Sequence, residues 1–290
     1  MRLRRLTLLV ALLLCSGSPA WAKLPAGADA TVLVEGDPRT RFRVAGLDLA
    51  SGLKPGTRIA LLGASVDPIS LAHLVLAALP LVDPAVRAQL GVDQVWIVPS
   101  PPRPDKAQRV PNGRRFAWTR LAARYLRKKG LPVYATDVEL RLAKGGFRGT
   151  YQLLKALERR FPGVELSVIV GEDVWNDLPT SKWRNGLGVV REHSLFVALR
   201  GDHADPKKAK ARVVKEALER QARQVILLPD AQEPGLRERL TRLLPRGFDL
   251  KLLPTLSSTA LREAFARGER SPVGVLPAVA RAILRAGSYR

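Results

Sequence analysis

The stretch that decides the fold reads IALLGASVDPISLAH and runs from Ile59 to His73. Its first residues, Ile59 to Leu62, are all apolar and follow the turn-forming sequence Lys54-Pro55-Gly56. A short continuous apolar run behind a turn is typical of a strand buried on both faces of a parallel sheet. We therefore expect this strand to lie in the core of an α/β domain.

The second half of the stretch predicts a tight connection into a helix. Gly63 ends the strand, Asp67-Pro68 indicates a bend, and the apolar run from Leu71 to Leu79 predicts the helix. The first N–H groups of a helix lack partners within it, so such a turn is suited to bind phosphate, and His73 falls in the first helical turn. The alternative is that the turn serves packing alone.

The rest of the chain alternates predicted strands and helices, which indicates a Rossmann-like α/β fold: an open parallel sheet with right-handed crossovers and helices on both faces. Further strands are expected at 95–98, 133–136, 166–170, 196–199 and 225–228. Further helices are expected at 113–129, 151–160, 260–267 and 276–285. Ligands of such sheets bind beyond the carboxyl ends of the strands.

Residues 23–57 precede this pattern and are interpreted as an N-terminal extension. The β-prone runs Thr31 to Glu35 and Arg41 to Val44 flank Gly36-Asp37-Pro38, which predicts a hairpin. The α/β domain is then expected to comprise residues 58–290.

The first 22 residues have the pattern of a secretory signal peptide. Basic residues lead into the apolar run Leu6 to Leu14, and Ala20-Trp21-Ala22 predicts cleavage after Ala22. We expect an exported protein of the bacterial periplasm or the medium, not spanning the membrane. Cys15, the only cysteine, lies within this segment, so the mature chain has no disulfide and no thiol catalyst; lipidation of Cys15 is the alternative.

The chain is strongly basic. It has 48 Lys and Arg against 26 Asp and Glu, a net charge of +22, which favours anionic partners such as phosphates or envelope polymers. The charges are scattered rather than blocked, apart from Lys207 to Lys210, so a nucleic-acid partner is not favoured. A surface that is simply rich in arginine is the alternative.

The quoted stretch resembles the nucleotide-binding loop of the nicotinate-nucleotide adenylyltransferase family, GGTFDPIHxGH. The matching residues are Gly63, Asp67, Pro68, Ile69 and His73. Ser65 stands for the family's threonine and Val66 for its phenylalanine. Two departures are chemical: Ser70 replaces the first histidine and Ala72 replaces a glycine.

The resemblance continues after the next strands. Val98 to Lys106 resembles VPAxxPPHK, keeping Lys106 but placing Asp105 at the histidine, and Arg115 matches a basic residue opening the next helix. Thr150 survives from GxSYTxDT, although capping of a helix is the alternative for it.

Two further segments and a closing motif extend the match to residues 58–289. Gly171-Glu172-Asp173 resembles GAD, and Leu178 to Trp183 resembles LPTWKxW with Ser181 in place of the stacking tryptophan. Leu256 to Arg262 resembles ISSTxxR, for which helix capping is again the alternative, and Ala286 to Tyr289 resembles the closing GLY.

By resemblance, the chain is expected to transfer AMP from ATP to a phosphate-bearing acceptor, nicotinate mononucleotide, with Mg²⁺ accompanying ATP and no metal held by protein ligands. The residues implied as catalytic are His73, Ser70, Lys106 and Arg262. Those implied for nucleotide binding are Gly63, Ala64, Ser65, Asp67, Ser257, Ser258 and Thr259. Those implied for acceptor binding are Thr150 and Asp173.

Two alternatives remain open from the sequence. The departures at Ser70, Ala72 and Ser181, together with export, are compatible with a nucleotide-binding pseudoenzyme, and the basic charge with a protein that binds envelope polyanions. The sequence contains no GxSxG, HExxH or P-loop motif, so nothing indicates a serine hydrolase, a zinc protease or a P-loop nucleotidase.

Overall fold

The computed structural model describes the backbone of six stretches of the chain: 29–34, 37–45, 53–102, 110–144, 149–199 and 206–289. Several predicted features lie outside the described residues: the signal peptide with Cys15, Asp105 and Lys106, and the Gly146 end of the turn before Thr150.

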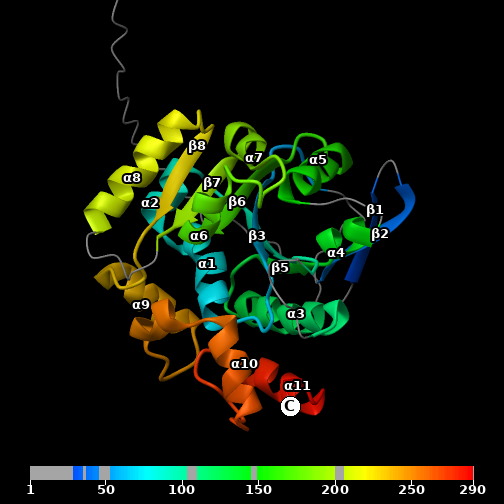
Figure 1. Cartoon of the computed structure of the whole chain (residues 1–290), viewed down its shortest axis with the longest axis vertical. Helices are drawn as coiled ribbons and strands as arrows, with labels where there is room; N and C mark the ends of the chain where they lie inside the picture. Colours follow the sequence, from blue (N-terminus) through cyan, green and yellow to red (C-terminus); the bar gives the residue numbers. More distant parts are fainter. Residues whose placement is uncertain are drawn as a thin grey trace, which may run out of the picture.

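One eight-stranded sheet forms the centre of the molecule, in the order β1-β2-β5-β4-β3-β6-β7-β8 (Figure 1). The strands β3 to β8 run parallel, whereas β1 and β2 pair antiparallel with each other and β2 pairs antiparallel with β5. The bounds of the strands are β1 Asp29–Val34, β2 Asp37–Ala45, β3 Arg58–Ala64, β4 Gln94–Pro99, β5 Val133–Thr136, β6 Glu165–Gly171, β7 Ser194–Ala198 and β8 Gln224–Leu228.

Helices connect the parallel strands and pack on both faces of the sheet (Figure 1). Their bounds are α1 Leu71–Val82, α2 Pro84–Gln89, α3 Asn112–Lys128, α4 Val138–Lys144, α5 Thr150–Arg160, α6 Glu172–Asp177, α7 Gly186–Glu192, α8 Pro206–Glu219, α9 Pro234–Leu243, the 3₁₀ helix η1 Leu250–Thr255, α10 Ser258–Ala266 and α11 Pro277–Arg285.

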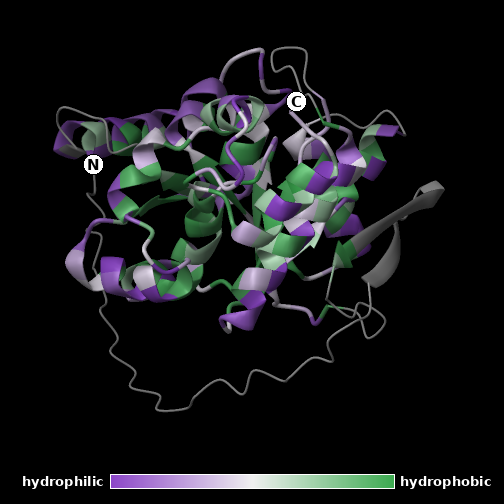
Figure 2. Ribbon diagram, turned by 90° about the horizontal axis from the view of Figure 1, so that it is seen from below, coloured by the Kyte–Doolittle hydropathy of each residue, from purple (hydrophilic) through white to green (hydrophobic). Residues whose placement is uncertain are grey.

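The sheet separates two hydrophobic cores, because successive strand side chains point to opposite faces. Ala60 and Leu62 of β3 enter the core that also contains α1, α3 and α9 to α11, whereas Ile59 and Leu61 enter the core with α5 to α8. Figure 2 shows hydrophobic residues gathered along the sheet and hydrophilic residues on the outer helix faces. Burial on both faces explains why the strands are apolar throughout rather than alternating.

The predicted parallel α/β sheet is confirmed, with one addition at its edge. The predicted hairpin forms, but Val44 and Ala45 pair with Thr136 and Ala135, so the segment continues the sheet instead of standing apart from it. The sheet is therefore mixed. The predicted strand 196–199 begins two residues earlier, at Ser194.

Several helices were not predicted from the sequence: α2, α4, α6 to α9 and η1. Most of them are short, and α6 has only six residues, too few for a clear helical period. Among the described residues, no helix combines the length and the apolar character needed to cross a bilayer.

The order of the strands places β3 at the point where the chain changes direction across the sheet. The strands β4 and β5 follow on one side of β3, and β6, β7 and β8 follow on the other. Connections diverge at this switch point, and the crevice they leave beyond the carboxyl ends of the strands is the usual ligand site of an open α/β sheet. The quoted loop begins there.

Candidate functional site

Three loops meet at the carboxyl edge of the central strands. Ala64 of β3 lies beside Pro99 of β4, and Leu62 pairs with Ile169, two residues before the end of β6 at Gly171. The loop 65–70, the segment after Pro99 and the start of α6 therefore leave the same edge of the sheet side by side. This edge is the candidate site.

Gly63 presents bare backbone at this edge. It is exposed, and a Cβ added to it would meet no protein atom within 4 Å. Its backbone is not in the left-handed region, unlike that of Val66 at φ 43°. Neither packing nor conformation therefore requires glycine at position 63.

The loop itself is buried beneath this open edge. The carboxylate of Asp67 is 1% exposed and accepts a hydrogen bond of 2.5 Å from the hydroxyl of Tyr289. Burial, and then the bond to Asp67, raises the pKa of Tyr289, so the phenol stays a donor. The hydrogen bond between Asp67 and Tyr289 thus stabilises the loop. A direct contact of the Asp67 carboxylate with a nucleotide stays a prediction.

Arg115 holds the loop to its neighbour. The guanidinium of this fully buried residue donates to the carbonyls of Ser65, at 2.5 Å, and Ser100, at 2.8 Å, and to the side chain of Asn112 at 2.6 Å. Burial lowers the pKa of Arg115 while the charge of Asp67 opposes the shift, and arginine remains protonated in proteins. The arginine therefore ties the ends of β3 and β4 together.

The C-terminal segment holds the loop from the other side. Arg262 donates to the carbonyl of Asp67 at 2.7 Å and to the hydroxyl of Thr259 at 2.9 Å. The hydroxyl of Ser258 donates to the carbonyl of Pro68 at 3.1 Å. Arg262, Ser258 and Thr259 are thus gathered at the loop as predicted, but the contacts observed are to the protein itself.

The remaining predicted hydroxyl at this end, Ser257, is the N-cap of α10. It accepts a hydrogen bond of 3.1 Å from the backbone N–H of Ala260. The capping interpretation of this serine is confirmed, and a role in nucleotide binding stays a prediction.

His73 occupies the first turn of α1 and is oriented by Ser70. Its Nδ1 accepts the backbone N–H of Ser70 at 3.2 Å and lies 2.7 Å from the Ser70 hydroxyl. This pattern leaves the ring proton on Nε2. Burial lowers the pKa of His73 from 6.5 to about 4, so at neutral pH the imidazole is an uncharged donor. Ser70, 2% exposed, acts on the ring rather than on the open edge.

The other side of the site begins at the end of β6. Asp173 lies in the first turn of α6 with its side chain exposed, and its carboxylate folds back over Gly171, 2.7 Å from where a Cβ would stand. Gly149, the N-cap of α5, lies against Arg184, so Thr150 is brought next to the turn that follows α6. The cap of α5 is therefore not Thr150.

This turn lacks a stacking surface at the expected place. Ser181 is exposed, whereas Trp183 is half-buried and packs against the core that contains α5 to α8. Trp183 is therefore a packing residue. The open position in the turn is therefore occupied by a hydroxyl.

The sequence did not predict the roles of Arg115 and Tyr289, two residues that hold the loop in place. Arg115 was matched only as a basic residue, and Tyr289 only as part of a closing motif. A lone arginine among the buried residues of α3, such as Phe116, Thr119 and Ala122, was a signal for the first. The contact of Tyr289 with Asp67 spans 222 positions and left no local signal.

Comparison with known proteins identifies relatives of the chain. No family model matches the chain. A "Probable nicotinate-nucleotide adenylyltransferase" of Gluconobacter oxydans is 35% identical over 167 residues, which cover 55% of this chain and 80% of that protein. One of Gluconacetobacter diazotrophicus is 33% identical over 175 residues, 60% and 75% of the two chains.

A more distant relative matches a smaller part. The Streptococcus pneumoniae protein of the same name is 31% identical over 132 residues, 45% of this chain and 56% of its own, so the chain spans about half the length of that relative. The Plasmodium falciparum nicotinic acid mononucleotide adenylyltransferase complexed with NaAD has a similar structure, with a TM-score of 0.55 and 17% identity, over 80% of this chain and 97% of its own.

The fold and the loop at its switch point define a nucleotidyltransferase-type α/β domain. On the similarity to the Gluconobacter and Gluconacetobacter proteins, the chain belongs to the nicotinate-nucleotide adenylyltransferase family.

Proposed function

We propose that the protein transfers the AMP moiety of ATP to nicotinate mononucleotide and releases pyrophosphate. The observation that carries the proposal is the juxtaposition at the switch point. The exposed backbone of Gly63 and the oriented imidazole of His73 lie at the carboxyl end of β3 and the start of α1. Asp173 and Thr150 lie on the side of the neighbouring strand β6. Family membership supports the same reaction.

The reaction needs no covalent intermediate. A phosphate oxygen of the mononucleotide forms a bond to the α-phosphorus of ATP, the bond from that phosphorus to the bridging oxygen breaks, and pyrophosphate leaves with the electron pair. The task of the protein is to hold the two phosphates in line and to stabilise negative charge.

The residues of the loop side suit this task. In the proposal, Gly63 allows phosphate to approach the backbone, because a side chain there would project into the approach. The Nε2–H of His73 donates to a phosphate oxygen near the first turn of α1, where the helix end also favours an anion. Arg262 and the start of α10 fix the loop and add positive charge beside it. Lys106 is proposed as a further contact to the triphosphate.

The site provides no preformed cage for a metal. Within the described stretches, no three His, Cys, Asp or Glu side chains are grouped so as to hold an ion, and the buried carboxylate of Asp67 is engaged by Tyr289. Mg²⁺ characteristically keeps several waters and binds substrate phosphates with one or two carboxylates. We therefore propose that Mg²⁺ arrives with ATP, and no step above depends on a protein-held ion.

The experiment is direct formation of the dinucleotide. Purified protein is incubated with ATP, Mg²⁺ and nicotinate mononucleotide, and the dinucleotide and pyrophosphate are measured together. Equal amounts of both products, and none when either substrate is omitted, support the proposal. Binding of ATP without product in the presence of the mononucleotide contradicts it and favours the pseudoenzyme alternative.

Two substitutions examine the departures from the family loop. Ser70→His with Ala72→Gly restores the family residues. Because Ser70 already orients His73 through Nδ1, we expect unaltered protein to be active and the double change to alter turnover by less than about tenfold. A gain of several powers of ten on reversion contradicts an intact site.

We also propose that the protein is exported and that the mature chain begins at Lys23. The support is the pattern of basic, apolar and small residues up to Ala22. N-terminal sequencing of protein from the envelope fraction tests it. A chain with an intact Met1 recovered from the cytoplasm contradicts it.

A further inference from the structure

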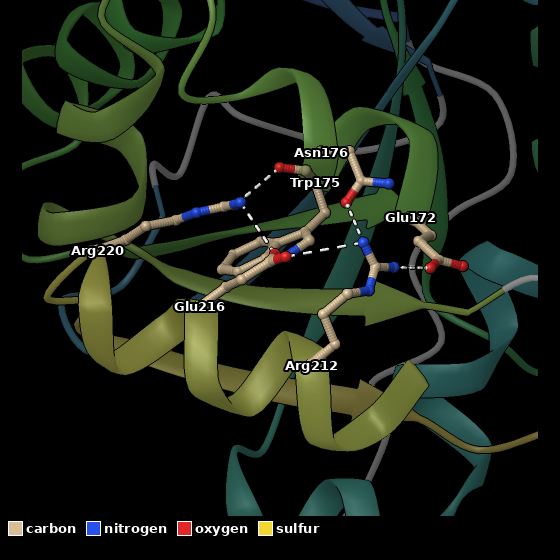
Figure 3. A network of polar contacts seen from close by, with 6 residues as sticks. All are labelled: Glu172, Trp175, Asn176, Arg212, Glu216 and Arg220. Atoms are coloured by element: carbon tan, nitrogen blue, oxygen red, sulfur yellow. Dashed lines mark hydrogen bonds and ion pairs between the residues drawn. The ribbon is translucent and has the colours of Figure 1, made fainter. Parts of the chain in front are cut away.

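The helix α6, which carries Asp173, is held by one neighbouring helix. Residues Glu172, Trp175 and Asn176 are spaced i, i+3 and i+4 and so share one helix face. All three are contacted by α8 or by Arg220 just beyond its end (Figure 3). Asp173 lies on the adjoining face and is exposed. The face of α6 that contacts α8 is therefore separate from the face that carries Asp173 at the candidate site.

The first contact between α6 and α8 is an ion pair between a buried carboxylate and a half-exposed guanidinium. The carboxylate of Glu172 is 4% exposed and accepts a hydrogen bond from the guanidinium of Arg212, which also donates to Asn176 at 3.2 Å (Figure 3). A buried carboxylate that loses its partner is strongly unfavourable. The start of α6 can therefore leave this position only if Glu172 is hydrated or paired elsewhere.

The second tie is centred on Trp175, which is fully buried. Its Nε1 donates to Glu216 at 2.8 Å, and its carbonyl accepts from Arg220 at 2.9 Å. The guanidinium of Arg220 also lies 4.4 Å from the centre of the indole ring and pairs with Glu216 at 2.9 Å. Trp175 is thus held through its indole ring, its indole N–H and its backbone carbonyl.

These ties matter because α6 is too short to be rigid on its own. A helix of six residues gains little from its internal hydrogen bonds. It continues directly into the turn that reaches Arg184 beside Gly149, where Thr150 begins α5. The placement of Asp173 and of this turn therefore depends on the contacts with α8 as well as on the packing of α6 against β6 and β7.

We propose that Arg212, Glu216 and Arg220 are positioning residues for the acceptor side of the site, acting through α6. The inference rests on the proposed function, because it assigns the mononucleotide to the side of Asp173. It requires that a loosened α6 weakens use of the mononucleotide while use of ATP is unchanged. A network that merely stabilised the fold has no reason to separate the two substrates.

The first test is Arg212→Ala, with KM measured separately for each substrate. We expect the KM for nicotinate mononucleotide to rise roughly ten- to a hundredfold, since displacement by about 1 Å has effects of that order, and the KM for ATP to change less than about twofold. Lys215→Ala is the matched control, because Lys215 lies on the same helix and pairs with the exposed Glu219 at 3.7 Å. It should leave both constants unchanged.

Further variants cover the case in which Arg212→Ala does not fold. Glu172→Gln with Arg212→Met removes both charges of this ion pair, so no buried carboxylate loses its cation, and the same selective rise in KM is expected. Arg212→Lys keeps the charge but cannot reproduce the fork to Glu172 and Asn176, and we expect partial recovery. Hydrogen exchange of the amides of 172–185 should speed up in the Arg212→Ala and double variants and not in Lys215→Ala.

The outcomes separate this inference from the proposed function. Dinucleotide formation by the unaltered protein, with both KM values raised alike or neither raised in the variants, overturns the positioning role and leaves the reaction standing. A folded unaltered protein that forms no dinucleotide overturns the proposed function and the acceptor role with it. A selective rise for the mononucleotide, together with faster exchange in 172–185, supports the inference.

Discussion

The two sides of the site are held in different ways. On the loop side, Arg115, Arg262 and Ser258 donate to backbone carbonyls of 65–68 and of Ser100. On the other side, α6 is held through side chains, by ion pairs and an arginine stacked on Trp175. The loop is thus fixed mainly through backbone carbonyls, together with the side chain of Asp67, and α6 mainly through side chains, together with the carbonyl of Trp175.

This difference has a consequence for how the site can change. Backbone carbonyls are present whatever the loop sequence is, so the loop side tolerates Ser70, Ala72 and Val66 while keeping its shape. The polar contacts between α6 and α8 depend on particular side chains of α8 and of Arg220. The side proposed to bind the acceptor is therefore expected to respond to substitutions in α8 that do not touch the loop.

The largest effect is expected for Arg115→Met. The change leaves the carbonyls of Ser65 and Ser100 without their buried donor, so we expect the free energy of unfolding to fall by about 3–5 kcal/mol. Urea denaturation measures it. Arg124→Met, at an exposed position of the same helix, should cost less than about 0.5 kcal/mol. Equal effects of the two changes contradict the role given to Arg115.

Arg262→Ala is expected to act next most strongly, and on ATP alone. In the proposed site its guanidinium also contacts ATP, and loss of a charge-assisted contact of the kind worth about 1.5–3 kcal/mol corresponds to roughly ten- to a hundredfold weaker ATP binding. Calorimetry with ATP and Mg²⁺ measures the change. Arg267→Ala, which loses an exposed pair with Glu269 at 3.0 Å just beyond the end of α10, should bind as the unaltered protein does. Unchanged affinity in Arg262→Ala removes this residue from the site.

Tyr289→Phe tests how much the hydrogen bond from the Tyr289 hydroxyl to Asp67 contributes to stability. The phenol hydroxyl is lost while the ring keeps its place against Trp118 and Phe265, whose centroids lie 6.0 Å away. We expect a loss of about 1–2 kcal/mol in the free energy of unfolding, since a buried acceptor loses one donor. Tyr125→Phe, at a half-buried tyrosine of α3, serves as the control in urea denaturation. No difference between the two variants contradicts the support of Asp67 by Tyr289.

The smallest effect concerns pH. The pKa of His73 is about 4 in the folded protein, below its ordinary 6.5, so the unfolded chain binds more protons between these values. Its contribution to stability is therefore present above pH 6.5 and is lost as the pH falls towards 4. Burial also lowers the pKa of His193, so both histidines contribute. His73→Gln should flatten the fall measured by urea denaturation between pH 7 and 4, and an unchanged slope contradicts the lowered pKa of His73.

The fold could be predicted from the sequence because its signals are local. The central strands are unbroken apolar runs, and the turns after them contain glycine and proline, so five of the six predicted parallel strands fall within the observed bounds. The short helices α6 and α7 carry no period long enough to be recognised. The antiparallel pairing of β2 with β5 joins segments about 90 residues apart and depends on the finished sheet.

The sequence predicts the positions of the candidate residues in the fold better than it predicts their contacts. His73, Gly63 and Asp173 lie at the edge of the sheet where the motif order places them. The roles of Ser70 and Asp67 could not be read from the sequence, because a hydroxyl aimed at Nδ1 and a carboxylate covered by Tyr289 are products of tertiary packing. For the same reason nothing in the sequence connected Glu172 with Arg212, 40 positions away.

The central claim is that two independently held sides meet at β3 to join ATP to nicotinate mononucleotide. The most direct measurement is the rate of dinucleotide formation as a function of each substrate, for Tyr289→Phe, Arg212→Ala and the double variant. We predict that the first raises only the KM for ATP, the second only the KM for the mononucleotide, and that the double variant shows both changes without further loss, as distant sites do. A single substitution that raises both constants together, or an unaltered protein that forms no dinucleotide, contradicts the account.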